Sequence, residues 1–259
     1  MNKNTKKKNG PAVLSAEDLE KTIGKGLSFG AAEAYKLLRI NLSFSLPKTS
    51  NCQVIGVTSS LRGEGKSTTS INIAYTMAET GKKVLLIEAD MRLPVMAKRL
   101  KIRQAPGLSN LLAGQSSGNE VLQNSGLLTN LKVIAAGAIP PNPAELLDSS
   151  QMETTLQVMR EYFDVIIVDL PPVTAVSDAV IVSKFLDGII LVCRQNYCDR
   201  KSLDAAVSQL RFSGAKILGF VVSDSDQQSK RYSKRYGKNY AYKNYGYAHP
   251  RKSDGTGRD

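Results

Sequence analysis

Residues 53–69 of the 259-residue chain read QVIGVTSSLRGEGKSTT, and this segment is the most informative about the fold. An apolar run ends at Ser59, a loop follows, and a helical stretch begins at Lys66. Gly63 and Gly65 allow backbone N–H groups to turn toward phosphate oxygens, and Lys66 can neutralise the β- and γ-phosphates of a nucleotide. The start of the helix adds a favourable dipole. The segment therefore predicts a nucleotide phosphate site made by Gly63, Glu64, Gly65, Lys66, Ser67 and Thr68.

The loop departs at one position from the Walker A consensus, which begins with Gly where this chain has Ser60. The rest of the motif lies in the strand–loop–helix context that phosphate binding needs. This context favours a phosphate loop over a chance glycine-rich turn. We expect the Ser67 hydroxyl to ligate Mg²⁺ and Thr68 to lie within reach of the α-phosphate.

Short apolar runs alternate with helical stretches along the rest of the chain. Several runs are continuously apolar, such as 165–168 and 189–192, which is typical of strands covered on both faces. Because strands and helices alternate, the sequence predicts an α/β fold with a doubly wound, mostly parallel sheet. The expected strands are 53–59, 83–90, 131–136, 165–171, 188–194 and 217–223, and the expected helices are 31–45, 66–80, 94–100, 143–162, 178–186 and 202–212.

Acidic residues at two strand ends complete a candidate metal site. Asp169 follows the apolar run 165–168, as in a Walker B motif, and Asp90 ends another expected strand. The carboxyl ends of parallel strands face the ligand crevice of such sheets, and Mg²⁺ needs few protein ligands. Ser67, Asp90 and Asp169 are therefore the predicted metal ligands. Glu88 shares a side of its strand with Asp90, so both are expected to face the nucleotide. The alternatives are a strand-end cap for Asp169 and a solvated position for one of the two neighbouring acids.

The net charge of +12 is concentrated at the two ends of the chain. Residues 1–10 contribute +4 and residues 229–259 contribute +7, whereas the residues between them contribute +1. Basic ends suggest nucleic acid, membrane or an acidic partner, or simple solubility. No apolar run approaches the ~18–20 residues of a membrane span, and we expect no secretory signal. Three cysteines without a pairable pattern favour a reducing cytosol, and the single histidine, His249, argues against histidine metal sites and a Ser-His-Asp triad.

The phosphate loop and the acidic strand ends together resemble the motifs of the bacterial tyrosine kinases, P-loop kinases that regulate capsule and exopolysaccharide synthesis. The resemblance extends from about Phe29 to the C-terminus. It includes Walker A at 54–69, a second acidic motif called Walker A′ at 85–92, Walker B at 169–172 and the segment PPNPAELL at 140–147. It implies a P-loop NTPase domain of the ParA/MinD-like type. It also implies a protein-tyrosine kinase that uses ATP and Mg²⁺.

The resemblance also implies a catalytic set of Lys66, Glu88, Asp90 and Asp169. It places the first acid of Walker A′ near the acceptor tyrosine hydroxyl as a base. The family usually has Asp at this position, whereas this chain has Glu88. The extra methylene shifts the reach of the carboxylate by about 1.5 Å. We therefore expect activity to be weakened or rearranged, but not lost, because phosphoryl transfer depends mostly on positioning and charge stabilisation.

The expected helix 31–45 resembles the family's oligomerisation element, Glu-x-x-Arg-x-x-Arg. Its three positions are occupied by Glu33, Lys36 and Arg39, with Lys36 in place of the first Arg. The spacing places these side chains along one side of the helix. A homo-oligomer, such as a ring with head-to-tail contacts, is the expected result. Lys lacks the bidentate fork of Arg, so we expect a weaker contact, and an ordinary solvated helix face is the alternative.

Six of the ten tyrosines lie near the C-terminus, interleaved with basic residues. Such a tract can bind single-stranded nucleic acid by stacking and charge. The phosphoacceptor cluster of the family occupies the same position, however, so we expect autophosphorylation in trans and no nucleic-acid partner. Each phosphate adds about −1.5 to −2 charges, so four of them would cancel or reverse the charge of this segment. The expected acceptors are Tyr232, Tyr236, Tyr240, Tyr242, Tyr245 and Tyr247.

The sequence thus predicts a basic N-terminal arm (1–28), a P-loop tyrosine kinase domain (29–228) and a basic, tyrosine-rich tail (229–259). The resemblance implies several partners: a membrane-bound activator or polysaccharide co-polymerase acting through its cytoplasmic tail, a cognate tyrosine phosphatase and other cytoplasmic protein substrates. It places the chain in the cytoplasm, recruited by the activator to the inner face of the membrane.

Two other functions remain as alternatives. The first is a ParA/MinD-type partition or positioning ATPase. Its phosphate loop carries a signature Lys five residues before the invariant one, where this chain has Leu61 beside Arg62. The second is a catalytically weak nucleotide-binding adaptor of a polysaccharide export complex, which Glu88 leaves open. The adenine pocket also differs, since Ser223 lies where the family often has Asn and would make fewer hydrogen bonds.

Overall fold

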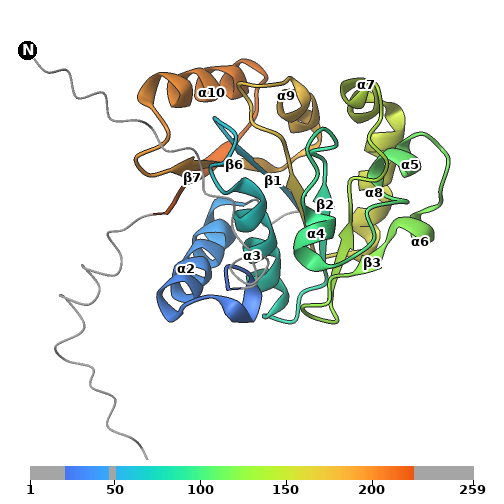
Figure 1. Ribbon diagram of the computed structural model, residues 1–259, viewed down its shortest axis with the longest axis horizontal. Helices are drawn as coiled ribbons and strands as arrows, with labels where there is room; N and C mark the ends of the chain where they lie inside the picture. The colour runs from blue at the N-terminus through green and yellow to red at the C-terminus, as the bar shows by residue number, and fades with distance from the viewer. Residues whose placement is uncertain (1–20, 47–50, 225–259) are drawn as a thin grey trace, which may run out of the picture. The chain divides into compact units, whose positions relative to one another are not determined.

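The centre of the molecule is a seven-stranded sheet in the order β3-β4-β2-β5-β1-β6-β7 (Figure 1). The computed structural model describes residues 21–46 and 51–224. Neighbouring strands run parallel, except that β3 pairs antiparallel with β4. This topology confirms the predicted doubly wound α/β fold, because the chain moves to both sides of β1. The strands are β1 (Gln53–Ser59), β2 (Val84–Glu88), β3 (Gln123–Asn124), β4 (Leu131–Ile134), β5 (Val165–Asp169), β6 (Gly188–Arg194) and β7 (Ile217–Ser223).

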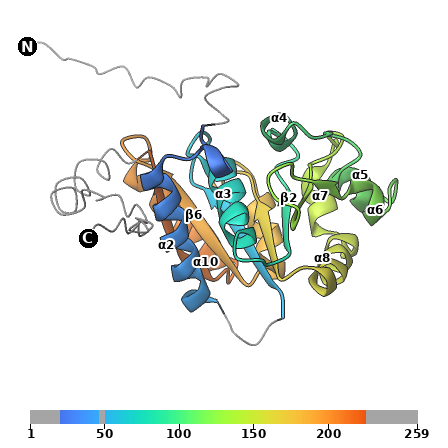
Figure 2. The same ribbon diagram turned by 90° about the horizontal axis from the view of Figure 1, so that it is seen from below.

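Helices cover both faces of the sheet (Figures 1 and 2). One face is covered by α2 (Phe29–Ser45), α3 (Lys66–Ala78) and α4 (Met96–Leu100), with the short 3₁₀ helix η1 (Gly24–Gly26) beside them. The other face is covered by α5 (Leu108–Leu112), α6 (Gly118–Val121), α7 (Pro143–Asp148), α8 (Ser150–Tyr162), α9 (Asp178–Val182), the 3₁₀ helix η2 (Ser183–Phe185) and α10 (Arg200–Phe212).

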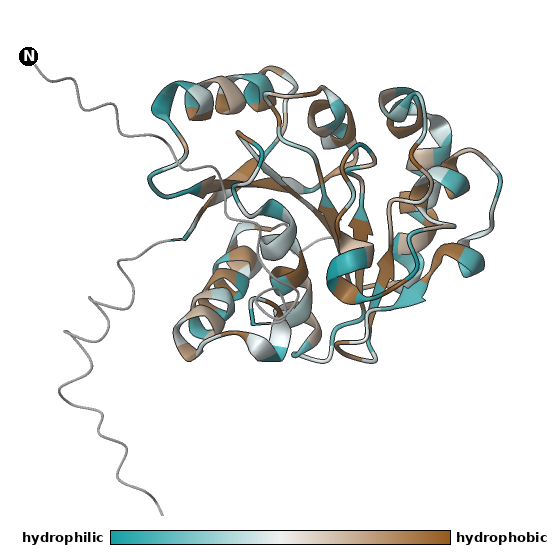
Figure 3. Cartoon of the chain, in the orientation of Figure 1, coloured by the Kyte–Doolittle hydropathy of each residue, from teal (hydrophilic) through white to brown (hydrophobic). Residues whose placement is uncertain are grey.

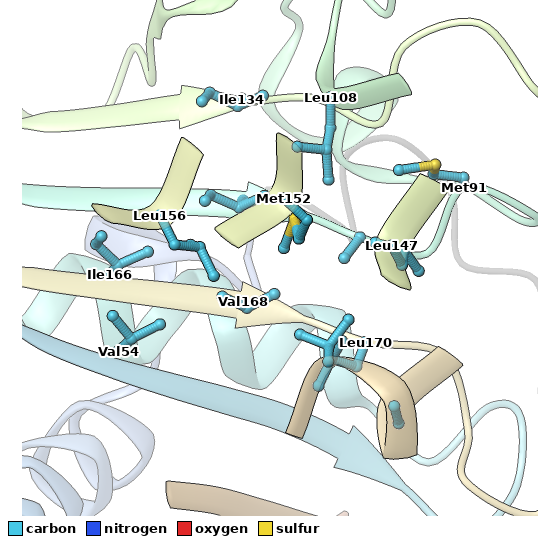
Figure 4. Close-up of a cluster of buried hydrophobic side chains, with 14 of the residues drawn as sticks. Val54, Met91, Leu108, Ile134, Leu147, Met152, Leu156, Ile166, Val168 and Leu170 are labelled. Carbon is cyan, nitrogen blue, oxygen red and sulfur yellow. The ribbon is translucent and has the colours of Figure 1, made fainter. Parts of the chain in front are cut away.

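Each central strand supplies apolar side chains to two separate cores. In β5, Ile166 and Val168 point toward the helices of one face, whereas Val165 and Ile167 point toward those of the other. Figure 4 shows the first of these cores, in which Met152 of α8 lies over the sheet. Burial of one large apolar side chain contributes about 1.5–3 kcal/mol. The double burial explains why the strands are apolar throughout, as the brown central strands of Figure 3 show.

The predicted helix 143–162 is in fact two helices, α7 and α8. Ser149 lies between them in an extended conformation, with φ −70° and ψ 154°. Its side chain accepts a hydrogen bond from the Met152 N–H, so Ser149 is the N-cap of α8. The prediction was wrong here because apolar residues continue on both sides of the cap. It also missed α5, α6 and β3, which are too short to show a clear periodicity.

The packed part of the chain begins before residue 29, where the expected domain boundary lies. Ile23 is 5% exposed and joins the core beneath α2 and α3. Asn72 of α3 accepts a hydrogen bond from the Gly24 N–H at 2.9 Å and donates one to the Thr22 carbonyl oxygen at 2.8 Å. The last residues of the expected arm therefore pack as part of the domain.

Within residues 21–46 and 51–224, no helix has the length and the apolar character that a membrane span requires.

Candidate nucleotide and metal site

The site residues predicted from the sequence lie at the carboxyl ends of three neighbouring strands, β2, β5 and β1. Glu88 and Asp169 are register partners at the ends of β2 and β5. The phosphate loop leaves β1 at the same edge and leads into α3 at Lys66. Parallel pairing therefore brings together side chains that are far apart in the sequence, at the edge where ligands bind in open α/β sheets.

The phosphate loop needs two glycines for its backbone conformation. Gly63 and Gly65 have φ angles of 86° and 91°, in the left-handed region that other residues rarely adopt. Ser223, at the end of β7, donates a hydrogen bond from Oγ to the Glu64 carbonyl oxygen at 2.6 Å. A Cβ atom on Gly65 would lie 3.3 Å from the same Oγ. The Ser223 hydroxyl thus holds the phosphate loop, a role that the sequence did not suggest.

The Glu64 side chain braces the loop from inside. The residue is fully buried, and its Oε2 accepts hydrogen bonds from Ser60 Oγ at 2.9 Å and the Leu61 N–H at 2.7 Å. Ser60, which replaces the consensus Gly, therefore donates one of the hydrogen bonds that hold the Glu64 side chain inside the loop. A carboxylate and a phosphate are both negatively charged and repel each other, so the Glu64 side chain does not bind a phosphate. Glu64 is available to the predicted phosphate site through its backbone N–H.

Lys66 lies between two of the predicted site carboxylates. Its Nζ is 2.8 Å from Asp90 Oδ2 and 3.5 Å from Asp169 Oδ2. Burial alone would lower the pKa of Lys66, but Asp169 and Asp90 outweigh burial, so the pKa is raised and the ammonium stays charged. Asp90 also accepts a hydrogen bond from the Leu93 N–H at 3.1 Å. The arrangement holds one positive charge at the start of α3, where nucleotide phosphates bind in P-loop proteins.

Asp169 has a carboxylate oxygen without a hydrogen bond, which fits a Mg²⁺ site. The residue is fully buried, and its Oδ2 accepts no hydrogen bond in the part of the chain that the structure describes, although the Lys66 ammonium lies 3.5 Å away. Its Oδ1 accepts a hydrogen bond from Ser70 Oγ at 3.0 Å. Burial raises the pKa of Asp169, and Lys66 together with the nearby serine hydroxyls offsets only part of that rise. The carboxylates of Asp90 and Asp169 with the Ser67 hydroxyl form an oxygen donor set suited to Mg²⁺.

Glu88 is enclosed by backbone from two loops. It is fully buried, and its Oε1 accepts hydrogen bonds from the Val95 N–H at 2.5 Å and the Met96 N–H at 2.7 Å. Its Oε2 accepts a hydrogen bond from the Ala136 N–H at 3.2 Å. Burial raises the pKa of Glu88 although these hydrogen bonds act in the opposite direction. The Glu88 side chain, which is one methylene longer than Asp, therefore holds the start of α4 and the segment just after β4. The sequence did not predict this geometry.

The three predicted oligomerisation residues lie on α2, but they do not form one group. Lys36 Nζ is 2.8 Å from Glu33 Oε1 within the helix. Arg39 turns instead toward α3 and donates from Nη1 to the Thr76 carbonyl oxygen at 2.8 Å. Large apolar side chains are exposed on the same helix, at Phe29, Leu37, Ile40 and Phe44. The six expected acceptor tyrosines and the basic residues around them lie outside the described residues.

Two further residues contact the site and were not singled out from the sequence. Ser70 lies one turn after Lys66, so its hydrogen bond to Asp169 follows from helical spacing and was open to prediction. Arg99 of α4 donates from Nη1 to Thr68 Oγ1 at 2.5 Å. Sequence spacing does not predict the contact of Arg99 with Thr68, because it depends on where α4, which follows β2, lies relative to α3.

Comparisons with known proteins give consistent matches. Residues 52–204 match a family model described as an AAA domain. The chain is 38% identical over 203 residues to tyrosine-protein kinase CpsD of Streptococcus pneumoniae serotype 4, which covers 78% of this chain and 88% of the relative. It is 36% identical over 192 residues to tyrosine-protein kinase YwqD of Bacillus subtilis, with coverage of 74% and 80%. The structure matches the kinase domain of Escherichia coli tyrosine kinase ETK with a TM-score of 0.70 and 32% identity, covering 75% of this chain and 77% of that one.

Proposed function

Because the chain belongs to the bacterial protein-tyrosine kinases, we propose that it transfers the γ-phosphoryl group of ATP to tyrosines in segment 229–259 of a neighbouring subunit. The observation that carries this proposal is the position of Lys66 between Asp90 and Asp169, at the junction of the phosphate loop and α3. A charge held there can stabilise the transferring phosphoryl group, and phosphoryl transfer depends mostly on such positioning and charge. The products are ADP and phosphotyrosine.

Different residues of the site bind the phosphates, bind Mg²⁺ and orient Asp169 in this reaction. The backbone N–H groups of the phosphate loop and the ammonium of Lys66 bind the phosphates of ATP. Ser67, Asp90 and Asp169 hold Mg²⁺, which neutralises charge on the β- and γ-phosphates when bound. Ser70 fixes the orientation of Asp169 by its hydrogen bond to Oδ1. These residues would hold the phosphates at the carboxyl end of the sheet.

Glu88 receives the proton of the acceptor tyrosine hydroxyl in this proposal. The phenolic oxygen then forms the new bond to phosphorus, and the bond to ADP breaks. Burial raises the pKa of Glu88, which makes its carboxylate a stronger base than that of an exposed Glu. Backbone N–H groups already use three of the roughly four acceptor positions of this carboxylate, so only Oε2 has one left for an acceptor hydroxyl. This limited capacity gives a physical reason to expect slower transfer than with a shorter, freer Asp.

We also propose that α2 forms the contact between subunits. Glu33 is exposed, and Leu37, Ile40 and Phe44 follow it at intervals of three to four residues, which places them along one side of the helix. An exposed stripe of large apolar side chains beside a charged residue is a feature of interaction surfaces. Transfer in trans requires an assembly of this kind, in which the chain that carries the acceptor is a second subunit.

Replacing Glu33 with Lys is expected to reduce the size of the assembly without unfolding the subunit. The substitution reverses a charge on the proposed contact, and it leaves the contact of Arg39 with Thr76 intact. Multi-angle light scattering measures the effect. Glu153→Lys on α8 makes the same charge change at an exposed position on the opposite face of the sheet and should leave the assembly unchanged. Assemblies of equal size for Glu33→Lys and wild type would show that α2 does not form the contact between subunits.

The biological setting follows from the resemblance to the capsule and exopolysaccharide kinases. We propose that the chain regulates the synthesis and export of such a polymer from the cytoplasmic face of the membrane. A membrane-bound activator recruits it through a cytoplasmic tail, and a tyrosine phosphatase reverses the modification. Phosphorylation of four or more of its tyrosines changes the net charge of segment 229–259 from positive to neutral or negative, and dephosphorylation restores the positive charge.

The kinase proposal is tested by incubating the purified chain and a cytoplasmic fragment of its activator with ATP and Mg²⁺. Phosphotyrosine should accumulate with time, and it should not form when Mg²⁺ is chelated. A DNA-binding titration in the same buffer tests the partition ATPase alternative. Tight DNA binding without phosphotyrosine would favour that alternative, and nucleotide binding without phosphotyrosine would favour the adaptor.

A further inference from the structure

Arg99 reaches the phosphate site from a different element than the residues already assigned to it. It lies on α4, and its Nη1 donates to Thr68 Oγ1 in the first turn of α3. The start of α4 is fixed in turn, because Glu88 accepts hydrogen bonds from the Val95 and Met96 N–H groups. Arg99 is thus held at the start of the phosphate-binding helix by two independent contacts.

The guanidinium of Arg99 lies beside the phosphate loop without a carboxylate partner among the described residues. Within the same residues Arg39 also lacks one, but it lies on α2 and donates to the Thr76 carbonyl oxygen. Arg99 is half-buried, and no acidic side chain lies within salt-bridge distance of it in the part of the chain that the structure describes. Three other arginines do have such partners: Arg92 with Asp178 at 3.0 Å, Arg160 with Asp187 at 3.2 Å and Arg194 with Asp224 at 2.7 Å.

The electrostatic surroundings of Arg99 favour an anion. Burial lowers the pKa of Arg99, and the longer-range attraction of Asp169 and Glu88 offsets only part of that effect. A desolvated cation without a close counter-charge is unfavourable, and an anionic ligand relieves that cost. Lys66, in contrast, is already in contact with two carboxylates. Arg99 therefore brings a positive charge to the phosphate site that protein carboxylates do not neutralise.

We propose that Arg99 binds the phosphates of the bound nucleotide from the α4 side, in the ADP complex as well as in the ATP complex. Its planar fork can donate two parallel hydrogen bonds to phosphate oxygens while Thr68 orients it. The inference rests on the nucleotide site of the proposed function, and it adds a binding residue that the P-loop motif does not contain.

The test compares Arg99→Met, Arg99→Lys and wild type by isothermal titration with ADP and with ATP in the presence of Mg²⁺. Arg99→Met should bind both nucleotides about tenfold more weakly or worse, because a hydrogen bond to a charged group is lost. Arg99→Lys keeps the charge without the planar fork, so its affinity for each nucleotide should lie between those of Arg99→Met and wild type. Lys98→Met, an exposed position on the same helix, is the matched control and should bind like wild type.

Thermal unfolding of the nucleotide-free proteins separates binding from a structural role. If Arg99 mainly binds phosphate, Arg99→Met should unfold within a few degrees of wild type, because an unpaired charge is removed along with one hydrogen bond. The inference is overturned if ADP affinity is unchanged, if only ATP affinity falls, or if affinity falls together with a large loss of stability. A wild-type chain that binds neither nucleotide would instead overturn the proposed function itself.

Discussion

Lys66→Met is expected to reduce phosphotyrosine formation by about three orders of magnitude or more. Removal of a single charge that stabilises a transferring phosphoryl group has effects of about 10³–10⁵ in related chemistry. In this chain the ammonium lies 2.8 Å from Asp90 and 3.5 Å from Asp169, at the start of the phosphate-binding helix. Quantitative phosphotyrosine blotting with ATP and Mg²⁺ measures the loss. Lys201→Met, at an exposed position on α10, should retain wild-type activity.

The same substitution should also destabilise the protein in a pH-dependent way. Removing one partner of a buried charge pair typically costs about 3–5 kcal/mol, because the remaining charge is left uncompensated. Without Lys66, the pKa of Asp169 rises further above its unfolded value. The destabilisation is therefore largest at neutral pH and is lost as the pH falls through the raised folded-state pKa of Asp169, because the carboxyl group is then neutral with or without Lys66. Denaturant unfolding at several pH values measures it, and a difference from wild type that does not change with pH would contradict the charge cluster.

Truncation after Ser229 is expected to remove nearly all self-labelling while leaving nucleotide binding unchanged. The truncated chain loses six of the ten tyrosines, whereas the loop, Asp90 and Asp169 all lie in the retained part. A full-length chain with all six tail tyrosines changed to Phe is the matched control, because it keeps the length and the basic charge of the tail. Titration with ADP and mass spectrometric counting of phosphates measure the two properties. Full labelling of either variant would place the acceptor elsewhere in the chain.

The sequence predicted the parts of the site that depend on strand ends. Asp90 and Asp169 follow apolar runs, Lys66 follows the loop that leaves a third, and in a parallel sheet the ends of such runs meet at one edge. Local rules were enough for this result because the strands are buried on both faces and have an unambiguous direction. The same rules failed at Ser149, where a cap interrupts apolar periodicity without changing it.

The contacts that shape the site depend on tertiary structure and could not be read from spacing. Glu88 was expected to face the nucleotide together with Asp90, yet its partners are backbone N–H groups at positions 95, 96 and 136. Ser223 holds the phosphate loop from the last described strand, and Arg39 turns to the carbonyl of Thr76. Each of these contacts joins segments that are brought together only when the helices pack on the sheet.

Transfer between subunits is tested most directly by a mixing experiment with two complementary chains. The chain truncated after Ser229 supplies an intact site without a tail, and full-length Lys66→Met supplies a tail without a working site. They are combined with the activator fragment, ATP and Mg²⁺, and phosphotyrosine is measured on the full-length chain. Transfer between subunits predicts phosphate on its tail tyrosines, at a rate that rises with the concentration of the truncated chain. An unlabelled tail in this mixture, alongside wild-type self-labelling at a rate independent of concentration, would contradict transfer between subunits.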